Sequence, residues 1–492
     1  MRLSMSRAHQ SISVPWALTV IGLGAFMTAL DQTVVVTALP SVMLDLKIPA
    51  TDLDRASWII TAYLLGYTVA MPLIGRLADV YGYPRVYQAS LLVFLLGSAM
   101  VAASGSLGWV VASRVIQAVG GGAAIPIGMA LASTLLPPER RGLALGIVGG
   151  AAEAGSMLGP AYGGAIVELA NWRWIFWLNL PQAALLFVAL FWLPNQRNRA
   201  ARVDYGGGAL LVAALLVLSL ALSRQGLFTL SSPTPFLVGA AGLLLALGLV
   251  RLESRVSQPL LYPVLFRSWA FLTATSTQLL VGTALIIAMV TVPLMANTVM
   301  GKEPFTGALW LLRMTVFIPA GALLGGALMH RAGIRAVTIT GLLLCAAGLF
   351  LVSTWPIGVE DPKLSLHLGL VGLGFGLVIA PIMARALEPA GNDYRGTAAS
   401  LVVVARMMGM TLGLAALSAW GVEHFQGLTA GLESPVPLPG EAPEAARLRL
   451  EAYTAAGLAL FHDFLRVAGA LSLLAVAPAI LMRKDRAPKP AD

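Results

Sequence analysis

The chain has 492 residues, of which 58% are hydrophobic and only 11% are charged, and its mean hydropathy is +0.82. Soluble domains carry about a quarter charged residues, so this composition excludes a soluble globular protein. The formal net charge of +9 does not indicate nucleic-acid binding, because the basic residues lie in short clusters between apolar runs. A single cysteine, Cys345, excludes a disulfide framework. The composition therefore indicates an integral membrane protein.

Apolar runs near 20 residues long predict fourteen membrane-spanning helices and an all-α fold. These runs lie at approximately 15–44, 55–74, 86–104, 108–134, 143–167, 174–194, 205–223, 234–253, 269–299, 306–329, 333–354, 365–388, 396–420 and 461–482. We expect a six-helix bundle in residues 1–194 and a second one in 269–492. Residues 195–268 then hold an inserted pair of helices with their linkers.

A weak internal repeat supports this division into two halves. GRLADVYG follows the second span and GALMHRAG follows the tenth, so glycines recur at the same separation at equivalent points. His330 stands in the second copy where Asp79 stands in the first. Parallel halves of this kind are typical of transporters.

The distribution of Lys and Arg between the spans predicts the orientation. Counted on alternate sides, 20 of these residues fall on the side of both termini and 8 on the other. Positively charged loops stay in the cytoplasm, so we expect a multi-pass protein of the cell membrane with both termini cytoplasmic. The longest segment on the outer side, 421–460, has a proline-rich half followed by a helix-like half.

Ionisable side chains inside apolar spans are the strongest functional signal. They are Asp31, Arg114, Glu153 and Arg406, with Arg313 as a fifth. Charges in hydrocarbon are costly, so they normally face a cavity or each other. Counting the helical rise makes an Asp31–Arg114 pair possible and puts Glu153 and Arg406 near the midplane. A carboxylate there can exchange protons during transport; the alternative is an ion pair that only fixes packing.

The segment GRLADVYGYPR supplies a candidate cytoplasmic gate. Its candidate residues are Gly75, Arg76, Asp79, Gly82 and Arg85. We expect Asp79 in a short turn beside the third span, where a carboxylate can engage the positive end of a helix or a basic side chain. Such a contact is a latch that breaks when the cytoplasmic side opens. The alternative is an ordinary helix cap.

A glycine-rich stretch with a proline follows Glu153 in the fifth span. Its members are Gly155, Gly159, Pro160, Gly163 and Gly164. Small residues let helices approach closely and proline bends a helix, so we interpret this stretch as a packing surface and hinge.

These motifs together resemble the major facilitator superfamily, specifically its fourteen-helix drug:proton antiporter branch. The matching segments, in order, are LDQTVVVTALP (Leu30–Pro40), GRLADVYGYPR (Gly75–Arg85), RVIQAVGGG (Arg114–Gly122) and GSMLGPAYGG (Gly155–Gly164). WIITAYLLGYTVAMPLIGRLADVYG (Trp58–Gly82) and VVVARMMGMTLGLAALSAWG (Val402–Gly421) are similar to the mycobacterial exporters linked to triacylglyceride and drug efflux.

The resemblance implies roles for the charged residues in the spans. Arg114 would belong to the proton relay of the family, and Asp31, Glu153 and Arg406 would take part in proton coupling or in the electrostatics of the cavity. Val80 and Tyr83 depart from the family pattern, since they replace basic residues in the turn after the second span. We expect this departure to weaken the latch.

The function expected is proton-coupled export of lipophilic or amphiphilic compounds, of the multidrug efflux type. Export of lipids such as triacylglycerides across or out of the inner membrane is the alternative, and a non-transporting receptor or scaffold is a third reading. We expect no cofactor beyond the proton gradient and no enzymatic activity, because a nucleophile–base pair and a metal cluster are both lacking. The expected partners are lipophilic molecules, protons and membrane lipids, with a periplasmic or cell-surface lipid carrier as a further candidate.

Overall fold

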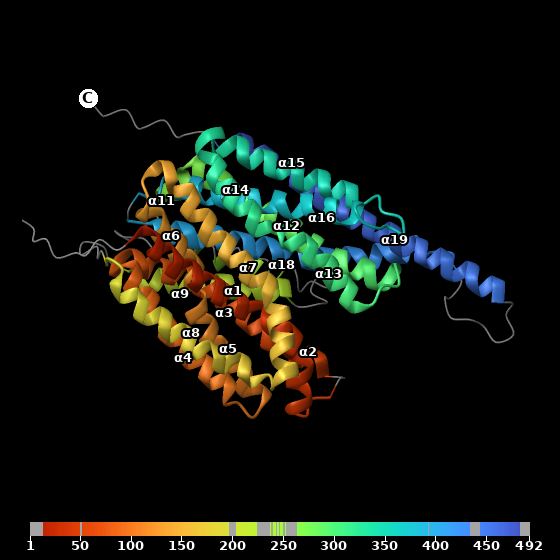
Figure 1. Cartoon of the computed structure of the whole chain (residues 1–492), viewed down its shortest axis with the longest axis horizontal. Helices are drawn as coiled ribbons and strands as arrows, with labels where there is room; N and C mark the ends of the chain where they lie inside the picture. The colour runs from red at the N-terminus through yellow and green to blue at the C-terminus, as the bar shows by residue number, and fades with distance from the viewer. Residues whose placement is uncertain are drawn as a thin grey trace, which may run out of the picture.

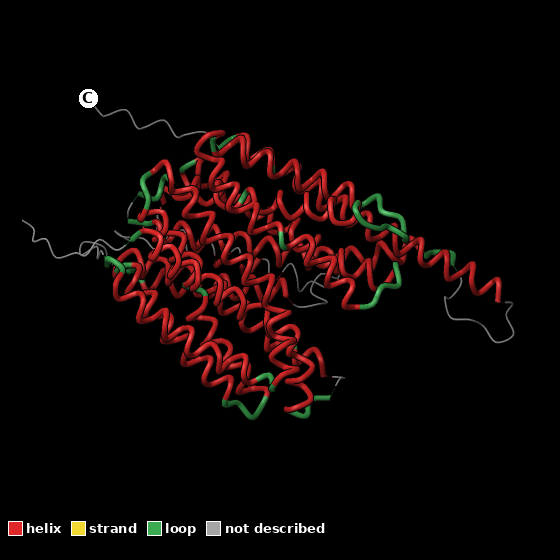
Figure 2. The backbone as a smooth tube through the Cα atoms, in the orientation of Figure 1, coloured by secondary structure: helices red, strands yellow, loops and turns green. Residues whose placement is uncertain are grey.

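The computed structural model describes residues 13–49, 52–195, 203–223, 263–391, 393–432 and 443–482, with isolated positions between 237 and 251. Within these ranges the chain is helical, and loops and turns alone connect the helices (Figure 2). The described residues contain twelve helices that are long and apolar enough to cross a membrane. The chain is therefore an all-α, multi-pass membrane protein.

The N-terminal half supplies the first six spans. Its helices are α1 (Val14–Asp45), α2 (Leu53–Ala56), α3 (Trp58–Tyr81), α4 (Tyr83–Ala102), α5 (Leu107–Gly121), α6 (Ala124–Leu135), α7 (Arg141–Leu169) and α8 (Arg173–Ala189), with short 3-10 turns at Pro138–Arg140 and Leu190–Trp192. Helices α5 and α6 together form one span, Leu107–Leu135.

The C-terminal half supplies the other six. Its helices are α12 (Trp269–Leu294), α13 (Pro304–Thr315), α14 (Phe317–Ala332), α15 (Ile334–Val352), α16 (Lys363–Leu377), α17 (Ile379–Leu387), α18 (Arg395–Leu428), α19 (Pro443–Leu474) and α20 (Val476–Ile480). A π turn, Met295–Val299, extends α12, and α11 (Pro263–Arg267) precedes it. The helix-like part of the predicted 421–460 segment is the first stretch of α19.

The predicted inserted pair lies between these two sets of six. Helix α9 (Tyr205–Ser223) occupies the seventh predicted span and packs against α3. The eighth predicted span, 234–253, falls mostly outside the described residues. The count of fourteen and the domain boundaries therefore stay predictions.

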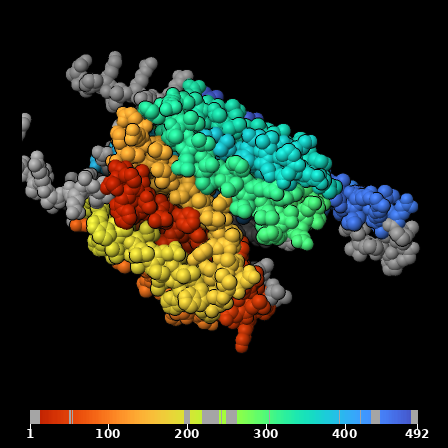
Figure 3. Space-filling model, viewed as in Figure 1, coloured from red at the N-terminus to blue at the C-terminus, as the bar shows by residue number. Residues whose placement is uncertain are grey.

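The two halves lie side by side as bundles (Figure 1). We call the end where α1 begins and α20 ends the terminal face, and the opposite end, with α2 and the start of α19, the distal face. Helix α1 packs on α7 in the first half, and α12 packs on α18 in the second. The space-filling view shows a notch between α7 and α13 that opens toward the distal face (Figure 3). The start of α19 extends beyond the rest of the bundle at that face (Figure 1).

The predicted repeat has a backbone counterpart. Gly82 ends α3 with φ of 95°, and Gly333 ends α14 with φ of 86°. Positive φ values favour glycine, because a Cβ atom would clash in this conformation. The same residue type therefore makes the same turn at equivalent points of both halves.

Candidate functional site

Asp79 connects the two halves at the terminal face. Its Oδ1 accepts hydrogen bonds from the Gly396 N–H (2.7 Å) and from the Tyr83 hydroxyl (2.8 Å). Its Oδ2 accepts from the Thr397 N–H (2.9 Å) and the Thr397 hydroxyl (2.8 Å). The buried carboxylate thus caps the N-terminus of α18, where free N–H groups and the helix dipole favour negative charge.

This geometry corrects the predicted setting of Asp79. The residue lies in the last turn of α3 rather than in a loop, and it engages α18 of the other half rather than the neighbouring α4. Tyr83, expected to weaken the contact, donates a hydrogen bond to it. Two backbone N–H groups and two hydroxyls hold the carboxylate, not basic side chains. The absence of basic residues at positions 80 and 83 therefore leaves the contact intact.

The two arginines of the predicted gate have different surroundings. Arg76 is fully buried, donates to the Asp393 carbonyl (3.2 Å) and lies over the Tyr394 ring, with its Cζ 4.2 Å from the centroid. Arg85 is exposed at the start of α4 and lies outside the contact between the halves.

Glycines allow the two halves to meet at the terminal face. A Cβ on Gly75 of α3 would lie 2.5 Å from the Gly396 carbonyl oxygen of α18, and a Cβ on Gly142 of α7 would lie 2.5 Å from that of Gly326 in α14. In both the α3–α18 and the α7–α14 contact, a glycine of one half thus packs against the carbonyl of a glycine in the other half. Only the first carries a carboxylate, because His330 occupies the position that corresponds to Asp79.

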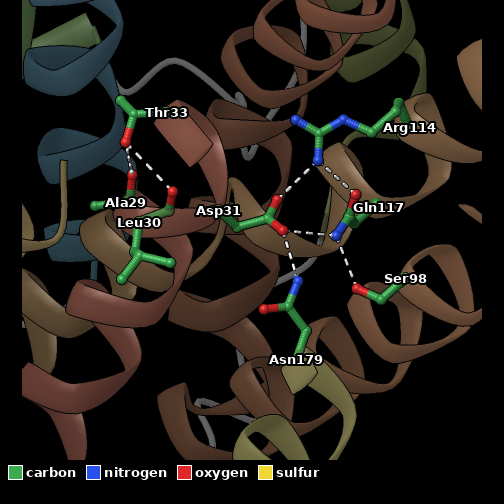
Figure 4. A network of polar contacts seen from close by, with 8 residues as sticks. All are labelled: Ala29, Leu30, Asp31, Thr33, Ser98, Arg114, Gln117 and Asn179. Atoms are coloured by element: carbon green, nitrogen blue, oxygen red, sulfur yellow. Dashed lines mark hydrogen bonds and ion pairs between the residues drawn. The ribbon is translucent and has the colours of Figure 1, made fainter. Parts of the chain in front are cut away.

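Asp31 forms the centre of a buried network inside the N-terminal half (Figure 4). It accepts hydrogen bonds from Arg114 (2.9 Å), Gln117 (3.0 Å) and Asn179 (2.6 Å). Gln117 also accepts from Arg114 (2.7 Å) and donates to the Ser98 hydroxyl (2.7 Å). Four helices, α1, α4, α5 and α8, therefore converge on one charged pair.

The structure brings Asp31 and Arg114 together, and both side chains are fully buried. Gln117, Asn179 and Ser98 were not anticipated. Gln117 could have been predicted from the sequence, because it follows Arg114 by three residues and therefore lies on the same face of the helix.

Glu153 of α7 and Arg406 of α18 form an ion pair across the two halves. Their side chains are 14% and 15% exposed, so the pair is largely shielded from solvent. A Cβ on Gly282 of α12 would contact the Arg406 backbone, which shows how closely α18 is held against its neighbour. The two residues placed near the midplane from sequence are thus in direct contact.

The glycine–proline stretch packs α7 against α1. A Cβ on Gly155, Gly159 or Gly163 would collide with α1, whereas a Cβ on Gly164 would meet nothing within 4 Å. Gly164 is therefore not part of this packing surface, in contrast to the prediction. Helix α7 continues through Pro160 without a break.

Arg313, counted among the charges inside the spans, lies near the distal end of its span. It donates to Asp361 (2.7 Å) in the loop before α16. Among the residues that the structure describes, no cluster of His, Cys, Asp and Glu side chains is suited to hold a metal ion.

Comparison with known families decides the class of this fold. The model of the Major Facilitator Superfamily matches residues 21–414, a region that includes both ion pairs and Asp79. The chain belongs to the major facilitator superfamily. It is therefore a membrane transporter, and the two six-helix sets are the two halves of the superfamily fold.

Curated relatives within the superfamily extend over most of the chain. A triacylglyceride transporter of Mycolicibacterium hassiacum is 38% identical over 87% of this chain and 83% of its own length. A triacylglyceride transporter of Mycobacterium tuberculosis is 35% identical over 96% of both chains.

Solved structures of the superfamily share the fold. The human organic anion transporter MFSD10 (TETRAN) superposes with a TM-score of 0.63 at 16% identity, and covers 96% of this chain and 100% of its own. The proton:xylose symporter XylE gives 0.62 at 14% identity, covering 94% of both chains. At such identities the likeness concerns the fold alone.

Proposed function

We propose that this transporter exports lipids, with triacylglycerides or similar long-chain esters as substrates, in exchange for protons. Two relatives named as triacylglyceride transporters support this substrate class over small drug-like molecules, because they match this chain over more than four fifths of its length. A lipid carrier on the far side of the membrane would be the natural acceptor for so insoluble a product.

The observation that carries the proton coupling is the Glu153–Arg406 ion pair. It joins α7 of one half to α18 of the other, so it persists only while these helices are together. A carboxylate left alone in apolar surroundings is costly, and taking up a proton removes that cost. Separation of the halves would therefore favour protonation of Glu153, and their return would favour release of the proton to re-form the pair.

The contacts between the halves suggest which state is present. Asp79, Gly75 and Gly142 make their contacts at the terminal face, whereas the notch opens at the distal face. We assign the terminal face to the cytoplasm because Lys and Arg are concentrated on that side. The arrangement then corresponds to the outward-facing state of an alternating-access cycle.

The decisive experiment compares two substrates in proteoliposomes with an imposed pH gradient. A fluorescent triacylglyceride and a lipophilic cationic dye are assayed side by side with the wild type and with Glu153→Gln. We expect gradient-driven export of the triacylglyceride by the wild type and none above protein-free liposomes for Glu153→Gln, because a neutral amide cannot take up or release the coupled proton.

Glu168→Gln is the matched control, since Glu168 lies on the same helix with an exposed side chain. It should export as the wild type does. Unchanged export by Glu153→Gln under an intact gradient would contradict the coupling role. Export of the dye without the triacylglyceride would replace lipid export by drug efflux.

A further inference from the structure

Two tyrosines on α3 lie near the two ion pairs. Tyr63 and Tyr67 are one helical turn apart, both are fully buried, and their rings stack with centroids 5.8 Å apart. Neither hydroxyl has a hydrogen-bond partner among the described residues. Buried hydroxyls are normally satisfied, so these two require an explanation.

Each tyrosine adjoins one ion pair. The Arg114 guanidinium lies over the Tyr63 ring, with Cζ 3.8 Å from the centroid, and the Tyr63 hydroxyl lies close to Asp31. Tyr67 lies on α3, which packs against α18, the helix that carries Arg406, and it is within electrostatic reach of Glu153 and Arg406. The two rings therefore form a row from the pair inside the N-terminal half to the pair that joins the halves.

The arginines at both ends of this row also have unused donors. Arg114 directs only Nη1 to Asp31 and Gln117, and its buried Nε and Nη2 find no acceptor in the described part of the chain. The buried Nε of Arg406 is in the same situation within those residues. Buried polar atoms without protein partners are typically satisfied by ordered water, which makes about three hydrogen bonds each. A line of such atoms is a place for a line of water molecules.

We propose that Tyr63 and Tyr67, together with ordered water, form a proton path between Asp31 and Glu153. In each step a hydroxyl or water accepts one proton and passes on another, so neither tyrosine changes its net protonation. The carboxyl at one end loses the proton that the carboxylate at the other end gains. The path rests on the proposed proton-coupled function and names the residues that connect its two charged sites.

Ring packing alone does not account for these residues. Phenylalanine would fill the same space and present the same face to Arg114, without the cost of burying two unsatisfied hydroxyls. The hydroxyl oxygens are therefore the part of these side chains that needs a role, and each tyrosine adjoins one of the two ion pairs.

Tyr87 of α4 provides a matched control. Its hydroxyl is equally buried and likewise lacks a partner in the described ranges, and it lies against Gly24 of α1. It interacts electrostatically with Tyr67 but with neither ion pair. The proposed path therefore does not include it.

The test follows protonation of Glu153 after a rapid pH drop, in purified protein in lipid nanodiscs, by time-resolved infrared spectroscopy. The carboxyl band is assigned as the one that Glu153→Gln removes. We expect Tyr63→Phe and Tyr67→Phe each to slow its appearance by about a hundredfold or more, the low end of what positioned proton-transfer groups contribute. Tyr87→Phe should leave the rate unchanged.

The possible outcomes distinguish a failure of the proposed proton path from a failure of the proton-coupled function on which it rests. A band with wild-type kinetics in either Tyr63→Phe or Tyr67→Phe would overturn the path alone, and so would equal slowing by Tyr87→Phe. A wild type without any Glu153 band would overturn the proton-coupled function and the path with it. Each variant is an independent test, so if one does not fold, as judged by its melting temperature, the other decides.

Discussion

The two ion pairs differ in how a movement of the halves affects them. Asp31 and Arg114 both belong to the N-terminal half and are held by side chains of the same half, so rigid-body motion leaves them together. Glu153 and Arg406 belong to different halves, so the same motion separates them. Glu153 is therefore the carboxylate whose surroundings depend directly on the conformation of the transporter, and Asp31 is the fixed one.

A third acidic residue, Asp361 at the distal end, tests whether the pH dependence of export comes from the ion pairs or from any carboxylate. The Ser365 hydroxyl and then the Arg313 guanidinium hold the pKa of the exposed Asp361 carboxyl below its usual range. A lowered pKa keeps the carboxylate charged above its ordinary value of about 4, and its contact with Arg313 is lost only as the pH falls further. We therefore expect Asp361→Asn to leave the pH dependence of export between about pH 5 and 8 unchanged.

This prediction is checked by measuring initial export rates of wild type and Asp361→Asn across that range, with Glu153→Gln as the negative control that should export nothing at any pH. A shift of the profile in Asp361→Asn would mean that the distal loop, rather than the ion pairs, senses protons.

At the scale of the helix, α7 shows how a proline is tolerated in an apolar span. Pro160 has no N–H, so the carbonyl of Ser156 one turn earlier loses its usual partner. The Thr33 hydroxyl of α1 donates to that carbonyl (3.0 Å), and the Thr37 hydroxyl donates to the Pro160 carbonyl (3.0 Å). The glycines of α7 bring α1 near enough for these bonds, so close packing compensates for the missing hydrogen bond within the helix.

Substitutions at two glycines of α7 distinguish the effect of helix packing on stability from the effect of helix propensity. A Cβ at Gly159 would collide with Thr33 and lie 2.9 Å from the Leu30 carbonyl oxygen, whereas a Cβ at Gly164 would meet nothing within 4 Å. We expect Gly159→Ala to lower the free energy of unfolding by roughly 1–3 kcal/mol through overpacking. Gly164→Ala should be neutral or stabilising by up to about 1 kcal/mol, because alanine is the better helix former.

Thermal unfolding in detergent, with both variants measured beside the wild type, provides the check. Equal melting temperatures for Gly159→Ala and the wild type would show that α1 and α7 are not packed as closely as the structure has them.

The sequence was sufficient to predict the twelve membrane-spanning helices found in the described residues, because a span of about 20 apolar residues has few alternatives to a helix. It was also sufficient to single out the charged residues that the structure pairs, since a charge stands out in an apolar run. Asn179, Tyr63 and Tyr67 did not stand out, because polar and aromatic residues are common in spans and only their neighbours in space give them a role. The partner of Asp79 was misplaced for the same reason, since α18 is 317 residues away in the chain.

At the scale of the whole molecule, the cross-half contacts divide the structure into a closed and an open end. The α3–α18 and α7–α14 contacts repeat the same glycine geometry, so the fold itself makes the closure nearly symmetric. Asp79 breaks that symmetry by adding hydrogen bonds to one contact only. Arg76 adds a further contact between the halves through the Asp393 carbonyl and the Tyr394 ring. Asp79 is the carboxylate among these contacts, so a single substitution there should change the balance between the two states.

Asp79→Asn should shift this balance toward opening of the terminal face. The asparagine amide would turn N–H groups toward the donors of Gly396 or Thr397, which costs about 1–3 kcal/mol and so raises the open population by roughly tenfold.

Pulsed electron paramagnetic resonance measures that population through the distance between two spin labels, attached at Arg85→Cys and Arg335→Cys. Both positions are exposed and lie on opposite halves, and the buried Cys345 does not compete for the label. Glu139→Gln, which neutralises an exposed carboxylate at the same face, should leave the distances unchanged. If Asp79→Asn gives the wild-type distance distribution, the other contacts of this face hold it closed, and Asp79 is an ordinary helix cap rather than a latch.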